Sequence, residues 1–147
     1  MSNNSPRDIL LAIEATLTAS PSLVPATIRQ LVIGRDPDHS AGFPFCCVYL
    51  ADFTSPVADT VSYERTYVFA IEFWQEATAK AKRDAELDYA GFLHTLLNRL
   101  QGTWQLGIGV EGSSVENGPV RAAEIDGTPA FVSTIRFSVL TLVQNPA

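Results

Sequence analysis

Apolar residues alternate with other residues through the middle of the chain, most regularly between Thr66 and Trp74. The residues at every second position there are Tyr67, Phe69, Ile71 and Phe73. A period of two is typical of a β-strand with one buried face, so the pattern predicts a central strand over 62–76. At about 3.3 Å per residue this strand spans roughly 40 Å, which is more than a small core requires. We therefore expect one end of it to project as a ribbon.

The second face of this strand combines apolar and polar residues, namely Val68, Ala70, Glu72 and Trp74. We expect a helix or another subunit to cover part of such a mixed face. Aromatic residues are also numerous around the strand: Tyr49, Phe53, Tyr63, Tyr67, Phe69, Phe73 and Trp74. Side chains on alternate faces do not all point into one small core. The surplus indicates either a contact with a partner or cover by a helix of the same chain, and both alternatives stay open.

Two stretches have apolar residues at helical spacing and predict amphipathic helices over 6–19 and 84–101. The first is expected to begin at Ser5, a capping hydroxyl followed by Pro6, and to end before Pro21. The second follows an abrupt change to small and charged residues, and Gly102 is expected as its left-handed cap. Its predicted apolar face consists of Leu87, Ala90, Leu93, Leu97 and Leu100, with Leu96 beside them.

Apolar, β-branched and aromatic runs predict further strands at 28–33, 45–53, 104–110, 120–125 and 130–143. We expect the strand at 45–53 to pair with the central strand as an antiparallel ribbon, and the last strand to lie beside the central one. Asp126 and Gly127 predict a tight hairpin turn before the last strand. The predicted fold is a single α+β domain over 1–147. In it, a mostly antiparallel twisted sheet with a long β-hairpin packs against the two helices.

The net charge of −6 argues against sequence-independent nucleic acid binding, because phosphate contacts need clustered Lys and Arg. Lys80 and Lys82 lie next to Arg83, and this short run predicts a solvated loop or helix start. Cys46 and Cys47 are adjacent in an apolar run, where a thiol behaves as a small hydrophobe. The chain has no run of about 18 apolar residues and no signal-peptide pattern at its N-terminus. We expect a protein of the reducing cytoplasm that contacts no membrane.

Each pattern that could indicate a catalytic, cofactor-binding or metal-binding site also has a simpler structural interpretation. The motif at 107–112 fits dinucleotide binding, but a helix precedes it and turn residues follow, so a flexible loop is expected. His39 is expected in a polar loop, and His94 lies inside the second helix without a partner at catalytic spacing. Asp84 and Asp88 are expected near a helix start on dipole grounds alone. We predict no catalytic, cofactor-binding or metal-binding residue, and an enzyme with an unrecognised site is the weakest alternative.

Three segments define the layout of the chain: a hairpin strand at 63–72, a helix segment at 93–100 and a closing strand at 131–142. They read YERTYVFAIE, LHTLLNRL and FVSTIRFSVLTL. Together with the short N-terminal helix and the strand and loop after it, this layout resembles the tail terminator or tail completion proteins of tailed bacteriophages. The resemblance implies a protein that is not an enzyme, has no cofactor and assembles with itself into a ring, usually a hexamer.

The resemblance further implies that the ring ends the tail tube and forms the surface on which the head docks. The implied partners are the tail tube protein and the head–tail connector proteins, and the implied location is the neck of the virion, assembled in the host cytoplasm. DNA can pass through such a ring without specific binding, which suits an acidic subunit. The alternative is a small α+β ligand-binding or regulatory module, with the loop at 107–118 as its lid.

A closed ring needs two different contact surfaces on each subunit. Tyr63, Arg65 and Arg136 lie on or near the long strands and have no obvious role in a core. We predict that these three residues contribute to the interface between subunits.

Overall fold

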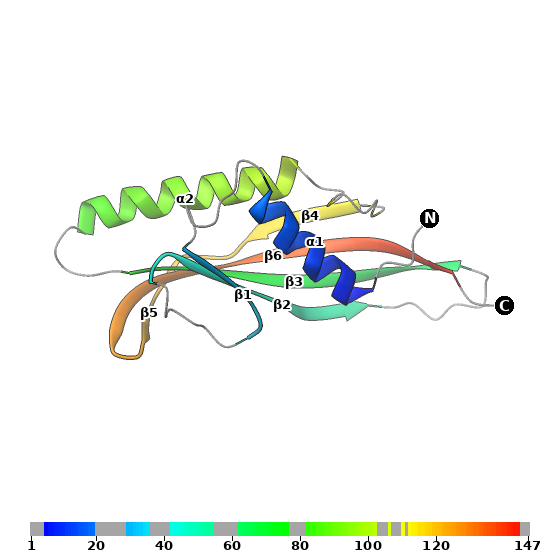
Figure 1. Ribbon diagram of the computed structural model, residues 1–147, viewed down its shortest axis with the longest axis horizontal. Coiled ribbons are helices and arrows are strands. Elements are labelled where there is room, and N and C mark those ends of the chain that lie inside the picture. The colour runs from blue at the N-terminus through cyan, green and yellow to red at the C-terminus, as the bar shows by residue number, and fades with distance from the viewer. Residues whose placement is uncertain are drawn as a thin grey trace.

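Two helices and a six-stranded mixed sheet form the computed structural model, which describes residues 5–19, 29–35, 42–54, 62–76, 82–102, 106, 110 and 112–144. The elements are α1 (Pro6–Thr18), β1 (Gln30–Ile33), β2 (Phe45–Thr54), β3 (Ser62–Glu76), α2 (Lys82–Gly102), β4 (Gly112–Asn117), β5 (Arg121–Ile125) and β6 (Thr128–Gln144). Both helices lie against one side of the sheet, and the β5–β6 hairpin curls away from them (Figure 1). The predicted α+β class is confirmed.

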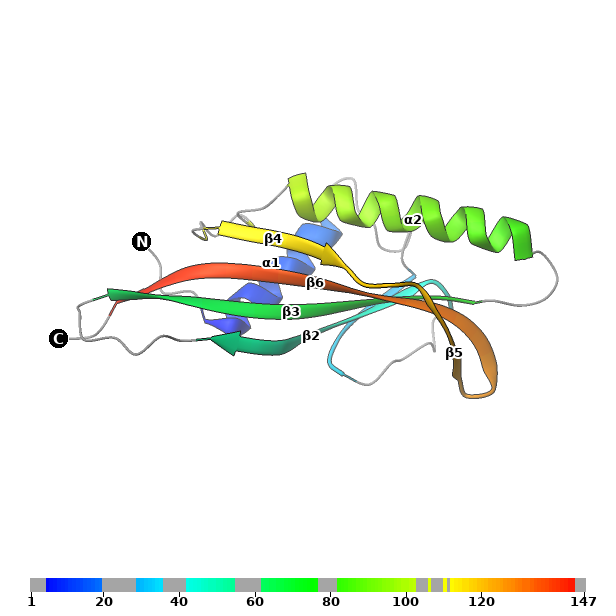
Figure 2. The ribbon, with the colours of Figure 1, turned by 180° about the vertical axis from the view of Figure 1, so that it is seen from behind.

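Strands β3 and β6 form the spine of the sheet. They pair antiparallel along the whole of β3, from Ser62 with Gln144 to Glu76 with Ala130. Strand β2 pairs antiparallel with β3 on one side, β4 pairs antiparallel with β6 on the other, and β1 joins β2 in parallel. Figure 2 shows β3 and β6 running together along the molecule. The predicted pairing of 45–53 with the central strand and the position of the last strand are therefore confirmed.

Helix α1 begins where the capping signal predicts. The Ser5 hydroxyl accepts a hydrogen bond from the Asp8 amide, and the Asp8 carboxylate accepts one from the Ser5 amide, both at 3.2 Å. This reciprocal pair satisfies two amide groups that a helix start leaves without partners. The face turned to the sheet consists of Ile9, Ala12, Ile13, Thr16 and Leu17, all buried.

Helix α2 buries the second half of the predicted face, where Leu96 and Leu100 are buried and Leu93 and Leu97 pack against the core, but not the first half. Among the side chains described from residue 86 onward, the buried ones are Tyr89, Leu96 and Leu100. Leu87 is 56% exposed and Ala90 is also exposed, so the prediction was wrong for both. The ring of Tyr89 lies 5.2 Å from the ring of Phe73 and 6.1 Å from that of Phe131, measured between centroids. Tyr89 lies outside the predicted face, and its packing on these two rings, together with Leu96 and Leu100, accounts for the side of α2 that faces the sheet.

The ends of α2 also differ from the prediction. The helix begins at Lys82 instead of residue 84, so the short basic run enters its first turn. Gly102 is its last helical residue and does not have a positive φ, which makes the predicted left-handed cap wrong. Glycine can adopt that conformation, but nothing in the local sequence compels it to do so. Among the described residues that follow, Leu106 has a positive φ of 55°.

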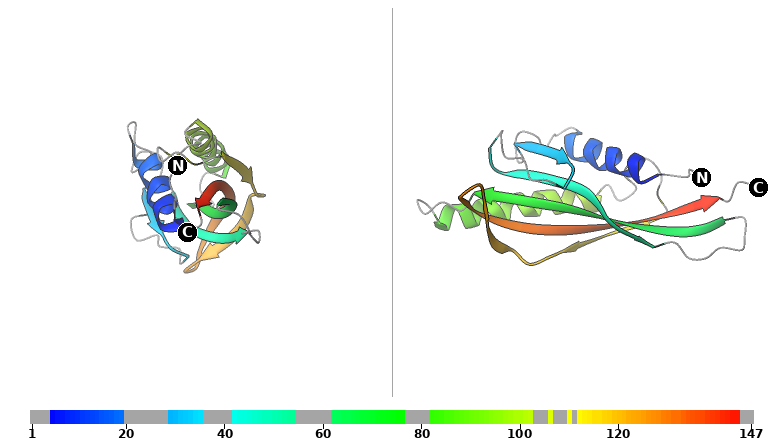
Figure 3. Two further views of the ribbon diagram at one scale, coloured as in Figure 1. Left: turned by 90° about the vertical axis from the view of Figure 1, so that its right-hand side faces the viewer. Right: turned by 90° about the horizontal axis from the view of Figure 1, so that it is seen from below.

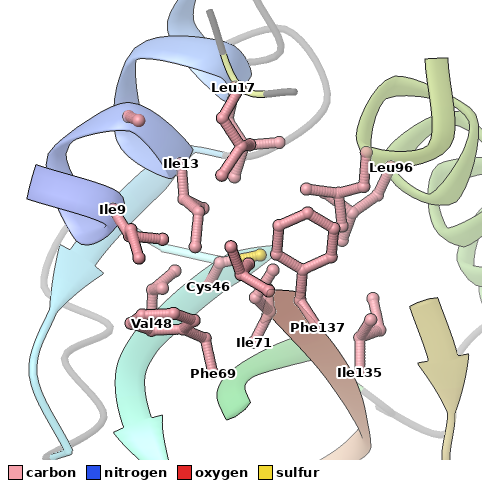
Figure 4. Packing of buried hydrophobic residues seen from close by; sticks show 14 of the residues in the cluster. Ile9, Ile13, Leu17, Cys46, Val48, Phe69, Ile71, Leu96, Ile135 and Phe137 are labelled. Atoms are coloured by element: carbon pink, nitrogen blue, oxygen red, sulfur yellow. The ribbon is translucent and has the colours of Figure 1, made fainter. Parts of the chain in front are cut away.

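The main core lies between the helices and the inner face of the sheet, defined here as the face turned toward them. The predicted alternation on β3 is confirmed, because Tyr67 is 4% exposed and Phe69, Ile71 and Phe73 are fully buried. Figure 4 shows where the other elements meet this strand, with side chains of α1, α2, β2 and β6 converging on it. The labelled residues are Ile9, Ile13, Leu17, Cys46, Val48, Phe69, Ile71, Leu96, Ile135 and Phe137.

Strand β4 lies within the stretch predicted as a loop at 107–118. Its six residues pair antiparallel with β6, from Gly112 with Leu140 to Asn117 with Ile135. The Gly118 amide then donates to the Thr134 carbonyl at 2.9 Å. Gly-Ser-Ser has low intrinsic β-propensity, and backbone pairing with the edge of β6 overrides it. The strand predicted at 104–110 falls largely outside the described residues, and neither Leu106 nor Val110 is in a strand.

The β5–β6 hairpin confirms the turn prediction. Asp126 and Gly127 both have positive φ, 50° and 82°, as a two-residue turn of type I′ requires. Viewed along the molecule, this hairpin lies on the side of the sheet away from α1 and α2 (Figure 3). It therefore lies against the second face of the sheet.

Candidate functional site

The face of the sheet turned away from the helices, called here the outer face, is the candidate functional surface. Its residues on β3 are Thr66, Val68, Ala70, Glu72 and Trp74, which alternate along the strand with the core residues. Three parts of this face differ in character: a covered end, a polar network in the middle and an open hollow.

The covered end holds a second buried cluster made of Phe45, Cys47, Trp74, Ala130 and Val132, against which Phe43, Ala123 and Ile125 pack. The rings of Phe45 and Trp74 are stacked, with 5.8 Å between centroids and an angle of 5° between planes. A helix or a second subunit was predicted to cover this face. At this end the β5–β6 hairpin and Phe43 of the same chain provide the cover instead. A bend that brings β6 back over its own sheet depends on long-range pairing, which the alternation in β3 does not reveal.

The polar network joins β2 and β3. The Glu72 carboxylate accepts a hydrogen bond from the Tyr49 hydroxyl at 2.6 Å and another from Trp74 Nε1 at 3.1 Å. The Arg35 guanidinium lies over the Tyr49 ring, 4.8 Å from its centroid, and donates to the Leu50 carbonyl at 2.6 Å. Burial, followed by the hydrogen bond to Glu72 and its charge, raises the pKa of Tyr49 to about 12, against a smaller opposing effect of Arg35. The network thus fixes Tyr49 in its protonated form.

The raised pKa of Tyr49 predicts a loss of stability at high pH. The pKa of tyrosine in an unfolded chain is about 10. The contribution of Tyr49 to the free energy of unfolding is therefore fully present below pH 10 and is lost as the pH rises toward 12. Unfolding in urea, measured at pH 9 and pH 11, is expected to show a larger loss of unfolding free energy in the native protein than in Tyr49→Phe. Tyr89, a buried tyrosine whose pKa burial also raises, is present in both proteins and acts as an internal control. An equal loss in both would contradict the assignment to Tyr49.

The open hollow lies toward the other end of the outer face. It has a volume of about 290 Å³ and is lined by Thr66, Gly112, Ser113, Ser114, Ser138 and Leu140. These residues come from β3, β6 and β4, and the missing side chain of Gly112 leaves space opposite Leu140. The lining offers hydroxyl groups and one apolar side chain and contains no residue that ionises near neutral pH. Such a lining suits contact with a side chain better than acid–base chemistry.

At the same end of the molecule, β3 and β6 extend beyond their neighbours. Strand β2 pairs with β3 only as far as Thr66, and β4 pairs with β6 only as far as Leu140. The pairs from Arg65 with Thr141 to Ser62 with Gln144 therefore have no third strand among the described residues. This confirms the predicted projecting ribbon.

Two of the three residues predicted at a subunit interface, Arg65 and Arg136, lie on opposite faces of the sheet. The Arg65 guanidinium donates to the Tyr67 hydroxyl at 3.0 Å and lies on the inner side of the ribbon. Arg136 is exposed on the outer face, where its register partners are Ala70 and Glu116. The backbone of Tyr63 pairs with that of Val143, and its side chain lies outside the described residues.

Groups with possible chemistry are scattered. His94 is exposed on α2, where its Nε2 lies 3.1 Å from Asn98 Nδ2, and Asp88 is exposed on the same helix. Cys46 and Cys47 are buried free thiols, and burial raises the pKa of Cys46 far above its usual range. Within the described part of the chain, no three His, Cys, Asp or Glu residues gather where they could hold a metal ion. His39 and Lys80 lie outside the described residues.

No family model and no curated protein matches this chain. Neither helix that the structure describes is long and apolar enough to cross a membrane. The glycine motif at 107–112 leads into strand β4, whereas dinucleotide binding requires a helix start at that point. The hollow, the projecting ribbon and the exposed residues beside them are therefore the features from which a function can be inferred. Sequence reasoning missed the hollow, because its lining comes from three strands that meet only in the fold.

Proposed function

We propose that the protein is a structural subunit of a tailed-bacteriophage virion, of the tail terminator or tail completion type. It assembles with copies of itself into a ring, with the hexamer that is usual for this class as the expected size. The ring ends the tail tube and forms the surface for head docking. Its partners are the tail tube protein and the head–tail connector proteins. It acts by contact and geometry and carries out no catalysis.

The projecting β3–β6 ribbon is the observation that supports this proposal most strongly. A two-stranded ribbon is only marginally stable in water and gains stability by packing on further protein. The pairs beyond Thr66 and Leu140 lack a third strand among the described residues, although their pairing continues to Ser62 and Gln144. A neighbouring subunit or a tail protein would supply a third strand or would pack against the ribbon.

The charge of the chain agrees with a ring through which DNA moves. Persistent DNA binding depends on clustered Lys and Arg that neutralise phosphates, and binding of that kind would slow passage. The net charge is −6, and the exposed arginines of the described strands, Arg121 and Arg136, lie on different strands. Such a surface favours passage of DNA over stable DNA binding.

Oligomeric mass and imaging test the proposal directly. Size exclusion with light scattering is expected to give a mass several times that of the 15.9 kDa chain, and negative-stain images are expected to show rings. Arg136→Ala and Tyr63→Ala are expected to lower that mass, because both residues are predicted at the interface. Arg121→Ala, at an exposed arginine of β5, is the matched control and is expected to leave the mass unchanged. A monomer at every concentration would contradict self-assembly, and an unchanged mass in the first two variants would contradict their assignment.

A small ligand-binding module is the second candidate, and the hollow beside β4 favours it. Its volume of about 290 Å³ approaches that of small-molecule sites. A monomer whose melting temperature rises when a small molecule is added would support this alternative over the ring.

A further inference from the structure

Phe53 is the most exposed of the large apolar side chains in the described part of the chain. It lies near the end of β2 and is 58% exposed, with its ring centroid 6.5 Å from that of Tyr67. Because it is the register partner of Tyr67, Phe53 projects from the inner face at the edge of the sheet. An exposed aromatic ring held by a strand is a common anchor of protein interfaces.

The edge that carries Phe53 is blocked against pairing with another strand. The register of β2 shifts between Leu50 and Asp52, which interrupts the ladder. The Leu50 carbonyl already accepts from Arg35 at 2.6 Å, and the Phe53 amide donates to the Asp52 carboxylate at 2.8 Å. A bulge and occupied backbone groups are devices that prevent sheets from joining edge to edge. A neighbouring molecule can therefore contact this edge through the Phe53 side chain, and not by pairing a strand with β2.

The hollow lies on the same row of the sheet at the opposite edge. Thr54 pairs with Thr66, Thr66 with Leu140, and Leu140 with Gly112. The last three of these residues line the hollow, and Phe53 is the neighbour of the first. Each chain thus carries an exposed aromatic ring at one edge and a recess at the other edge, at the same level and on opposite faces.

We propose that the Phe53 ring of one copy occupies the hollow of the next copy. The hollow has a volume of about 290 Å³ and is open to solvent, so a flat aromatic ring can enter it from outside the sheet. The ring would rest on Leu140 in the space that Gly112 leaves free. A contact between two different surfaces of the same chain is heterologous, and repetition of it closes a ring or extends a filament. Because the two surfaces are on opposite faces, neighbouring copies overlap at their edges.

This inference rests on the proposed function, because it names the contact through which the ring forms. It explains why one edge is blocked: overlapping subunits need an edge that does not continue the sheet. It also gives each subunit the two different surfaces that a ring demands.

Two variants remove the two halves of the contact. Phe53→Ser removes an exposed ring, and Gly112→Leu fills the hollow. A Cβ at Gly112 would lie 3.9 Å from the Leu140 Cβ, which is ordinary contact, so this substitution is compatible with the fold. Each variant alone is expected to be a monomer at concentrations where the native chain forms rings, with association weakened about tenfold or more per contact. Leu87→Ser, at the 56% exposed leucine of α2, is the matched control and is expected to form rings.

Mixing the two variants provides the decisive measurement. Phe53→Ser keeps an intact hollow and Gly112→Leu keeps an intact Phe53, so the mixture is expected to form pairs that cannot extend. Light scattering should then show a dimer in the mixture and a monomer in each variant alone. Circular dichroism of both variants checks that the fold is retained. If the native chain forms rings and both variants also form them, or if the mixture gives no dimer, the inference is overturned while the proposed function stands. If the native chain itself is always a monomer, both fail.

Discussion

Phe137→Ala is expected to lower the free energy of unfolding by about 3–5 kcal/mol, a large share of the roughly 5–15 kcal/mol by which a domain is stable. Phe137 is fully buried in the middle of β6. Figure 4 shows its ring near Leu96, between α2 and the sheet. Truncation removes apolar contacts and leaves a cavity that the two long strands cannot close, because β6 is held by strands on both sides. Equilibrium unfolding in urea measures the effect.

The matched control is the same truncation at Phe53. That side chain is 58% exposed, so Phe53→Ala is expected to cost less than about 1 kcal/mol in the monomer. Unfolding must be measured at a concentration where the protein is monomeric, since subunit contacts add to apparent stability. Equal losses at both positions would contradict the assignment of Phe137 to the core.

The elements that the sequence predicted well are those whose causes are local. The alternation around Phe69 and Ile71 needs only one buried face, and the capping pair of Ser5 and Asp8 needs only three residues of spacing. The turn at Asp126 and Gly127 is equally local. In each case, the interaction that fixes the structure lies within the stretch that carries the pattern.

The predictions that failed depend on segments distant in the sequence. Strand β4 forms because β6 offers an edge, and its polar sequence carries no alternation that could reveal this. The buried side of α2 depends on where Tyr89 meets Phe73 and Phe131, which belong to two strands. The cover over Trp74 requires β6 to bend back with β5. None of these features has a signature of its own at the residues concerned.

The candidate site was predicted only in outline. The projecting ribbon followed from the length of the central strand, and Phe53 was among the aromatic residues counted as surplus. The hollow combines Thr66, Leu140 and Gly112, which are widely separated in the sequence. Hydroxyl residues and glycine have no sequence pattern that predicts a hollow, so the hollow is recognised only from the pairing register of the strands.

The Arg99 side chain also stabilises the fold through residues distant in the sequence, since its two partners lie 83 and 80 positions away. Its Nη1 donates to the carbonyl of Thr16 at 2.9 Å and to that of Ala19 at 3.2 Å. Helix α1 has no basic residue in its own last turn, so a cation of α2 satisfies the carbonyl groups at its end and the negative end of its dipole. This contact joins the two helices over the core.

Arg99→Met keeps most of the aliphatic side chain and removes the charged donor. We expect the free energy of unfolding to fall by about 1.5–3 kcal/mol, the usual value of hydrogen bonds to a charged group. Arg99→Lys should recover part of the loss, because an ammonium group retains the charge without the planar fork. The matched control is Arg7→Met at an exposed arginine of α1, where a change within about 0.5 kcal/mol is expected.

Amide hydrogen exchange gives a second measurement: the last turn of α1 should lose protection in Arg99→Met before the strands do, because its carbonyl groups lose their partner. Uniform loss of protection throughout the domain would show instead that Arg99 acts on global stability and not on the end of α1.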